Sequence, residues 1–182
     1  LNLNGSITFS SGTNWNRTAT TTLNPPAGNY TLDFAGKTLN GSMTFNGNIN
    51  AVWTLVNDYK CGTNVTTTFQ QGKFYSNGYF VDFGYSLNAN NTNTKLFDFT
   101  GTDTVRVRRE WSLNATGTTL NMGGAVLLIQ SSSAETLYFR GAGLTYGDLV
   151  VRQLHANIDS MFLEGNNVLG AVNITITNRK DI

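Results

Sequence analysis

The stretch Phe69–Trp111 contains the alternation that decides the fold, and it reads FQQGKFYSNGYFVDFGYSLNANNTNTKLFDFTGTDTVRVRREW. Its short aromatic and β-branched runs are separated by three turn-forming segments, Ser76–Gly78, Asn88–Thr94 and Gly101–Asp103. Asn and Asp tolerate a left-handed backbone, and Gly adopts it without a Cβ penalty. In Thr104–Arg108 every second residue is apolar, which is typical of a strand with one buried and one wet face. The spacing predicts short strands linked by turns.

The composition of the whole chain favours an all-β protein. Asn and Thr each occur about two dozen times among the 182 residues, and only 13% of residues are charged. No apolar stripe at helical spacing lasts three turns. A hydrophobic content of 40% with 12% aromatic residues is too rich for a disordered chain. The length predicts one domain over residues 1–182, in which residues 1–30, with the Pro25-Pro26 cluster, form an irregular or capping part.

Charge and cysteine content exclude several classes of partner. The net charge of +1 gives no reason to expect nucleic acid, and Arg106, Arg108 and Arg109 are interpreted as the solvated face of one strand. Cys61 is the only cysteine, so no internal disulfide is expected. No run approaches eighteen apolar residues, so the chain is not expected to span a membrane. Because it opens within a strand-like run, we expect a mature segment or a piece of something longer.

Strand candidates recur along the chain, and a faint internal echo accompanies them. Segments 36–45, 72–81 and 141–150 resemble one another at offsets of 36 and 69 residues, roughly one and two multiples of a common step. Fixed periods in this range are typical of solenoids. The further strand candidates are 6–10, 17–23, 31–34, 38–39, 42–45, 52–56, 120–130, 136–139, 144–151, 158–163 and 168–177.

Two all-β architectures fit these short strands. A β-sandwich uses many strands with turn signals every eight to twelve residues, and it is kept as the alternative. The parallel β-helix, or β-solenoid, is favoured because many strands begin or end with Asn, Thr or Gly, which suit the corners of a coiled chain. The links are also longer and more variable than the two-residue turns of a meander. In a β-helix each rung pairs with the next about 4.8 Å away.

Five motifs follow one another in the last two thirds of the chain, and they are Asn77-Gly78-Tyr79, Lys95-Leu96-Phe97-Asp98-Phe99, Thr104-Val105-Arg106-Val107, Phe139–Tyr146 and Gly165-Asn166-Asn167. Together they resemble the β-helical repeats of the large secreted surface proteins of Bacteroidota, including gliding-motility adhesins exported by the type IX secretion system. The resemblance covers roughly residues 50–177, and it implies a β-helix, a secreted or cell-surface location and an adhesive role. Glycans and adjoining repeats of the same chain are the partners that it implies.

The same resemblance gives meaning to two short segments. Asp103-Thr104-Val105 and Asp159-Ser160-Met161 match the Asp-Ser/Thr-apolar pattern of O-glycosylation in that phylum. Thr104 and Ser160 are therefore predicted as O-glycosylation sites.

The sequence contains no catalytic constellation. His155 is the only histidine, which excludes a histidine pair or a multi-histidine metal site. On successive rungs of a solenoid, Asp82, Asp98 and Asp103 could converge, as carboxylates do in β-helical polysaccharide lyases and glycosidases. A turn role for such strand-end Asp residues is the simpler interpretation. No cofactor is expected, although Ca²⁺ at an Asp/Asn-rich turn is a possible one.

The three tryptophans have two interpretations. Trp15, Trp53 and Trp111 either fill the core or cap an end, which is favoured, or they form a platform on which sugar rings stack. The leading functional hypothesis is a non-catalytic structural and adhesive module of a bacterial cell-surface or secreted protein, in possible contact with glycans. The alternatives are a carbohydrate-active β-helix enzyme and a segment of a phage or secretion-system fibre.

Overall fold

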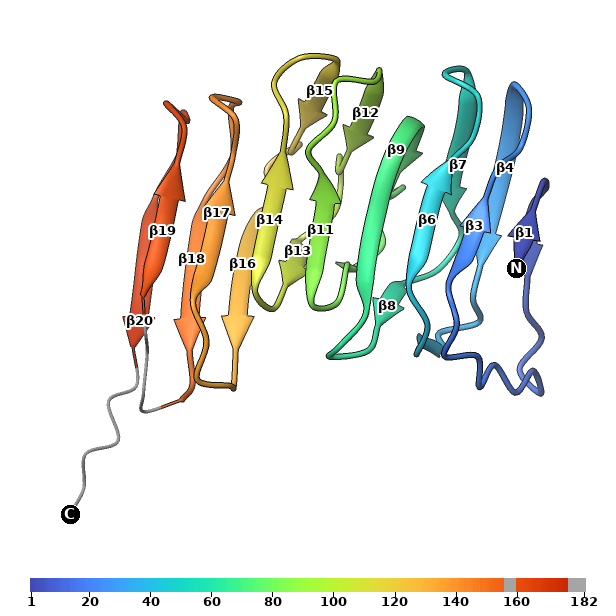
Figure 1. Cartoon of the computed structure of the whole chain (residues 1–182), viewed down its shortest axis with the longest axis horizontal. Coiled ribbons are helices and arrows are strands. Elements are labelled where there is room, and N and C mark those ends of the chain that lie inside the picture. The colour runs from blue at the N-terminus through green and yellow to red at the C-terminus, as the bar shows by residue number, and fades with distance from the viewer. Residues whose placement is uncertain (156–159, 177–182) are drawn as a thin grey trace.

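A computed structural model describes residues 1–155 and 160–176. These residues contain strands and turns but no helix, and every pairing between their named strands is parallel. The strands stack as a β-solenoid of about 7 turns, with the first and last coils at opposite ends of the long axis (Figure 1). The predicted parallel β-helix is therefore confirmed. The alternative β-sandwich is wrong, because consecutive strands wind around one core instead of forming two facing antiparallel sheets.

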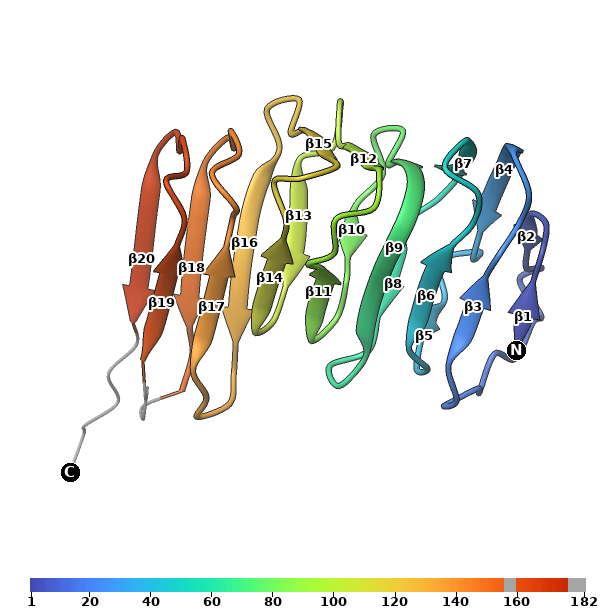
Figure 2. The same cartoon turned by 45° about the horizontal axis from the view of Figure 1, so that its top comes forward.

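Successive strands of the coil belong to three sheets, called A, B and C here (Figure 2). Sheet A contains β1 (Asn2–Leu3), β3 (Thr21–Leu23), β6 (Met43–Asn46), the first part of β9 (Thr66–Tyr75), β11 (Ser86–Ala89), β14 (Glu110–Leu113), β17 (Leu137–Arg140) and β19 (Met161–Glu164). Sheet B contains β2 (Ile7–Thr8), β4 (Gly28–Asp33), β7 (Ala51–Leu55), the second part of β9, β12 (Lys95–Asp98) and β15 (Thr118–Asn121). Sheet C contains β5 (Thr38–Leu39), β8 (Tyr59–Cys61), β10 (Val81–Asp82), β13 (Thr104–Val107), β16 (Val126–Ser131), β18 (Leu149–Gln153) and β20 (Val172–Ile176).

The strand register gives the length of one coil. Phe74 pairs with Phe97, and Phe97 pairs with Leu120, which is a step of 23 residues each time. The second and third similar segments, 72–81 and 141–150, are separated by 69 residues, which equals three such steps. The first and second, 36–45 and 72–81, are separated by 36 residues, which is not a whole number of coils. The predicted repeat is therefore wrong in its period. The first two of the similar segments begin with a glycine, but the two glycines occupy different positions in the coil. Gly36 follows β4 at a corner, whereas Gly72 lies within β9.

Asn and Asp are abundant because they shape the corners of the coil. Asp33 Oδ1 accepts a hydrogen bond from the backbone nitrogen of Ala35 at 2.8 Å, and Asp98 Oδ1 accepts one from Thr100 at 2.9 Å. Asn121 Oδ1 accepts the equivalent bond from Gly123 at 3.1 Å, one coil further on. Such side-chain bonds to the residue two positions ahead imitate a backbone turn. These turn bonds are local, and the neighbouring coil adds others: Asn57 Oδ1, for example, accepts a hydrogen bond from the backbone nitrogen of Phe34 at 3.1 Å.

Aromatic rings fill the interior and contact one another from coil to coil. The ring centroids of Phe45 and Phe69 lie 5.1 Å apart, and those of Phe69 and Phe97 lie 4.7 Å apart. All three rings are fully buried.

The last described coil is different, because its inward positions have no coil beyond them among the described residues. Val172 and Ile174 are each 47% exposed there.

Individual strand predictions were right where the alternation was unbroken. The strand 38–39 is confirmed as β5, but the predicted strand 120–130 is wrong as one element, because Gly123 and Gly124 have φ of 56° and 90° and divide it into β15 and β16. Segment 17–23 forms a strand only at its end, and Tyr59–Cys61 was not predicted at all. Of the last two candidates, residues 158, 159 and 177 lie outside the described residues.

Candidate functional site

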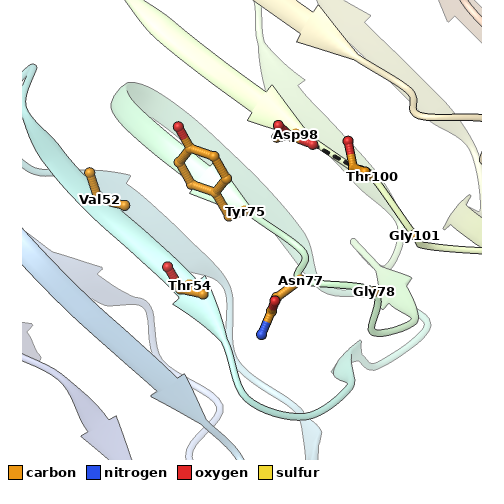
Figure 3. Close-up of a pocket in the computed structure, with 8 residues that line it drawn as sticks. All are labelled: Val52, Thr54, Tyr75, Asn77, Gly78, Asp98, Thr100 and Gly101. Carbon is orange, nitrogen blue, oxygen red and sulfur yellow. Dashed lines mark hydrogen bonds between the residues drawn. The ribbon is translucent and has the colours of Figure 1, made fainter.

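A groove of about 530 Å³ lies on the outer side of sheet B, near the corner that leads to sheet C (Figure 3). It crosses three neighbouring coils, represented by β7, β9 and β12. Its lining residues are Val52, Thr54, Tyr75, Asn77, Gly78, Asp98, Thr100 and Gly101. The groove is the largest of the concave surfaces described here, and both polar and apolar side chains line it.

Strand register brings the central residues of the groove together. Thr54 pairs with Tyr75, and Tyr75 pairs with Asp98, so the three side chains occupy one row across successive coils. Neighbouring rungs are separated by about 4.8 Å. The row faces outward because strand neighbours alternate: Phe74, next to Tyr75, is fully buried in the core. Three residues that are far apart in sequence therefore form one polar surface with an aromatic ring in its middle.

Tyr75 is the aromatic centre of the groove. Its half-buried ring lies between the β7 residues on one side and Asp98 on the other in Figure 3. At the end of the groove the Asn77-Gly78 turn has left-handed backbone at both residues, with φ of 52° and 81°. Asn77 Nδ2 donates to the carbonyl oxygen of Leu55 at 3.2 Å, which fixes the amide over the preceding coil.

Asp98 supplies the carboxylate of the groove. Its Oδ1 accepts the turn hydrogen bond from Thr100, while its Oδ2 has no hydrogen-bond partner among the described residues. The groove thus offers a ring face, an anionic acceptor, an amide and the hydroxyls of Thr54 and Thr100. This set can bind a polyhydroxylated ligand, with the ring against its apolar face and the polar groups at its hydroxyls.

Asp82, Asp98 and Asp103, which the sequence left open as a converging group, do not come together, and the simpler turn role holds for Asp98. Asp82 lies in β10 of sheet C and Asp98 in β12 of sheet B, while Asp103 is exposed just before β13. The coil places successive strands on different sides of the solenoid, so short sequence separation does not bring them together. Within residues 1–155 and 160–176 no group of three or more His, Cys, Asp or Glu side chains could hold a metal ion.

Asp82 instead belongs to a buried ion cluster with two arginines of the basic segment. Its side chain is 2% exposed, and it accepts from Arg106 Nη2 at 2.5 Å and from Arg108 Nη2 at 2.9 Å. Arg108 Nη1 also donates to the same carboxylate at 3.1 Å. The interpretation of these arginines as a solvated strand face is therefore wrong for Arg108, whose side chain is only 18% exposed.

Two of the three tryptophans are core residues. Trp53 and Trp111 are fully buried, and Trp111 Nε1 donates to the hydroxyl of Tyr146 at 3.1 Å. The favoured core interpretation is confirmed for both, and the sugar-stacking prediction is wrong because neither ring can reach a ligand. Trp15 is half-buried and packs on Phe9, with ring centroids 4.9 Å apart. It does not line the groove.

Tyr75 was not predicted from the sequence as a residue of a binding site. The useful signal was the alternation in Gly72–Ser76, which puts Phe74 inside and Tyr75 outside.

Cys61 is buried, and burial raises the pKa of its thiol from 9.0 to about 12, so the thiol stays protonated at neutral pH. His155 is half-buried in a bend after β18.

The two predicted O-glycosylation sites occupy different settings. Thr104 is half-buried at the start of β13, whereas Ser160 is exposed just before β19. Asp159, the first residue of the second pattern, lies outside the described residues. Both sites stay predictions.

Among the described residues there is no helix with the length and apolar character needed to cross a membrane. Comparison of the chain with protein-family models, with curated proteins and with solved structures found no match.

Proposed function

We propose that this chain is a non-catalytic structural and adhesive module that contacts a glycan through the groove on sheet B. The observation that carries the proposal is the row of Thr54, Tyr75 and Asp98, which presents an aromatic ring between hydrogen-bonding groups. Sugars combine apolar ring faces with many hydroxyls, so a partly exposed ring beside a carboxylate and an amide is a suitable partner.

The structural half of the role follows from the way in which the coils stack. Parallel ladders run along the solenoid, and a continuous buried core extends from Ile7 to Val151. Most strands between the two ends are paired on both sides, although β15 pairs only with β12, so few backbone groups in the middle of the rod are left to fray. A rod of this kind holds the groove rigidly, which lowers the entropic cost of binding.

Binding is favoured over hydrolysis by the number of carboxylates. A glycosidase of the usual kind needs two carboxyl groups on opposite sides of the scissile bond. Asp98 is the only carboxylate among the residues that line the groove. The carbohydrate-active enzyme therefore stays the alternative function, and it would need a second acid from elsewhere.

The cell-surface or secreted location, and a source among the Bacteroidota with type IX export, rest on the resemblance of the sequence motifs described above. The Asn- and Thr-rich corners form a polar, weakly charged exterior, which suits a protein that meets glycans or neighbouring rods.

A glycan-binding measurement on the purified chain tests the proposal. A panel of immobilised neutral oligosaccharides is screened with the wild type, with Tyr75→Ala and with Asp98→Asn. We expect at least one ligand whose binding weakens about tenfold or more in Tyr75→Ala. The reason is that stacking of a ligand ring on an aromatic side chain, like a hydrogen bond to a charged group, contributes one to a few kcal/mol to binding.

Phe162→Ala is the matched control, because it removes an exposed aromatic ring from sheet A, far from the groove. It should bind like the wild type. Equal loss in Tyr75→Ala and Phe162→Ala, or retention in both, would contradict the assignment of the groove. Release of reducing ends from any bound ligand would favour the enzyme instead.

A further inference from the structure

A second concave surface lies on the outer side of sheet C, on a different face of the solenoid from the glycan groove. It is a depression of about 130 Å³, and its lining residues are Arg106, Arg108, Gln130, Ser132 and Leu154. The register explains the grouping, because Val107 pairs with Ile129 and so places Arg108 next to Gln130. A smaller depression that shares Arg108 and Ser132 adjoins it.

The two arginines carry more positive charge than their partner neutralises. Asp82 is the one carboxylate that pairs with both, so the cluster of Asp82, Arg106 and Arg108 has a net charge of +1. Arg152 adds a further exposed positive charge on the same face, since it pairs in register with Gln130. Asp58 is matched by Lys60, at 2.8 Å.

The remaining acid near the depression is also engaged. Glu135 accepts hydrogen bonds from the hydroxyls of Tyr85 at 2.8 Å and of Ser131 at 2.6 Å, and it lies 4.0 Å from Arg109 Nε. Its charge is therefore balanced by Arg109 and not by the arginines of the depression. The surface immediately around the depression therefore keeps a positive excess from Arg106, Arg108 and Arg152, while the exposed Asp103 and Asp148 lie at the other end of their strands.

The arginines differ in their free hydrogen-bonding capacity. Arg108 is almost saturated, because it donates to Asp82 and to the carbonyl oxygens of Cys61 and Gly62. Arg106 donates only from Nη2 among the described residues, and its guanidinium is held in place by the ring of Phe80, 5.4 Å away. Its Nη1 edge thus stays available on a side chain that is 30% exposed.

We infer that this depression binds the carboxylate of an acidic sugar residue, such as a uronate within an oligosaccharide. Arg106 Nη1 donates to the carboxylate, in the way that Nη2 already donates to Asp82. Gln130 and Ser132 supply neutral hydrogen-bonding groups for hydroxyls, and Leu154, which is 51% exposed, supplies an apolar contact. This site is independent of the proposed function, because none of its residues lines the groove on sheet B.

Gln130→Glu tests the site without removing an existing ion pair. It places a negative charge beside Arg108 inside the depression, and Gln130→Asn is its neutral control. Binding of a uronic-acid oligosaccharide is measured by calorimetry at low ionic strength, together with a neutral oligosaccharide of the same length. We expect Gln130→Glu to weaken uronate binding by about tenfold or more, while Gln130→Asn changes it by less than about threefold.

The other arms separate this site from the alternatives. Tyr75→Ala should leave uronate binding unchanged, so failure of the glycan groove and failure of this site are distinguishable. Equal affinity for the neutral oligosaccharide, unchanged binding in Gln130→Glu, or equal competition by a poly-glutamate peptide would each overturn the inference. The last result would mark a non-selective basic face.

Discussion

A Cβ atom on Gly72 would lie 2.5 Å from Cζ3 of Trp53. The two residues meet at the corner between sheets A and B, where β9 continues from one sheet into the next and its pairing with β6 shifts register between Phe45 and Asn46. Gly72 has a φ of 107°, and Trp53 is fully buried. The absence of a side chain at Gly72 therefore serves both the bend of the strand and the packing of the indole ring.

Gly72→Ala should destabilise the protein by about 2–5 kcal/mol, through overpacking against Trp53 together with a backbone conformation that L-residues rarely adopt. Urea denaturation followed by tryptophan fluorescence measures the change. Two other glycines separate the causes. Gly47→Ala meets Trp53 at 2.9 Å without a positive φ, and Gly124→Ala has a φ of 90° with nothing within 4 Å.

Gly12→Ala is the control for this series, because nothing lies within 4 Å of its added Cβ and its φ is not in the left-handed region. Its stability should stay within about 0.5 kcal/mol of the wild type. If Gly72→Ala matched Gly12→Ala, the corner would be able to relax and the packing argument would fail.

Two isoleucines in the same row of sheet C should differ in their contribution to stability. Ile129 is fully buried, whereas Ile174 is 47% exposed two coils later. Ile129→Ala should cost about 2–5 kcal/mol, since it removes buried methyl groups and leaves a cavity. Ile174→Ala should cost roughly 1 kcal/mol or less, because about half of its side chain is already in water. Equal costs by chemical denaturation would show that the last coil is covered in solution.

Asp98 has two roles that substitution can separate. Asp98→Ala removes the turn hydrogen bond to Thr100 and should lower stability by about 0.5–1.5 kcal/mol. Asp98→Asn should keep that bond, because Asn121 makes the same turn in the next coil and pairs in register with Asp98. Thermal melting of both variants measures the difference. A melting temperature for Asp98→Asn as low as that of Asp98→Ala would show that the charge itself stabilises the corner.

Alkaline pH should destabilise the fold through Cys61. Burial raises the pKa of the folded thiol from 9.0 to about 12, so above pH 9 the unfolded chain loses a proton that the folded chain keeps. The stabilisation is therefore complete below pH 9 and is lost as pH rises toward 12. Between pH 9 and 10 the free energy of unfolding should fall by about 1 kcal/mol from this group.

Cys61→Ala removes that ionisation, and its stability should change less between pH 9 and 10 than that of the wild type, whatever its stability at pH 7. Above pH 10 both proteins should weaken, because burial also raises the pKa of Tyr59 and Tyr146. Equal slopes for the two proteins between pH 9 and 10 in urea titrations would contradict a buried, protonated thiol.

The winding of the chain could be predicted from sequence because the corners are encoded locally. Asn, Asp and Gly at strand ends carry their own turn bonds, as Asp98 and Asn121 do, so their spacing indicates a coil before any tertiary contact is known. The coil length could not be predicted in the same way. Corners differ in length, and β9 passes one of them as continuous strand, so similar short motifs fall at different points of the coil.

The candidate sites were less predictable because they depend on register. Tyr75 and Asp98 are adjacent only since one coil places them opposite each other, and a single residue more in a corner would separate them. Asp82 was singled out as an acid of a possible catalytic group, and the structure pairs it with Arg106 and Arg108 from the next coil. The alternation in Thr104–Arg108 showed that both arginines share one face, but not which carboxylate lies beside them.

The 23-residue step between Phe74, Phe97 and Leu120 also determines how the rod would respond to tension. Each coil contacts only its neighbours, so a pulling force applied at one end would detach coils one after another. A released coil of that length extends by up to about 80 Å, whereas it occupied only about 4.8 Å of the rod. Under load the coils would unfold one after another, in steps whose size follows the length of each coil, and so absorb work before the distant coils are disturbed.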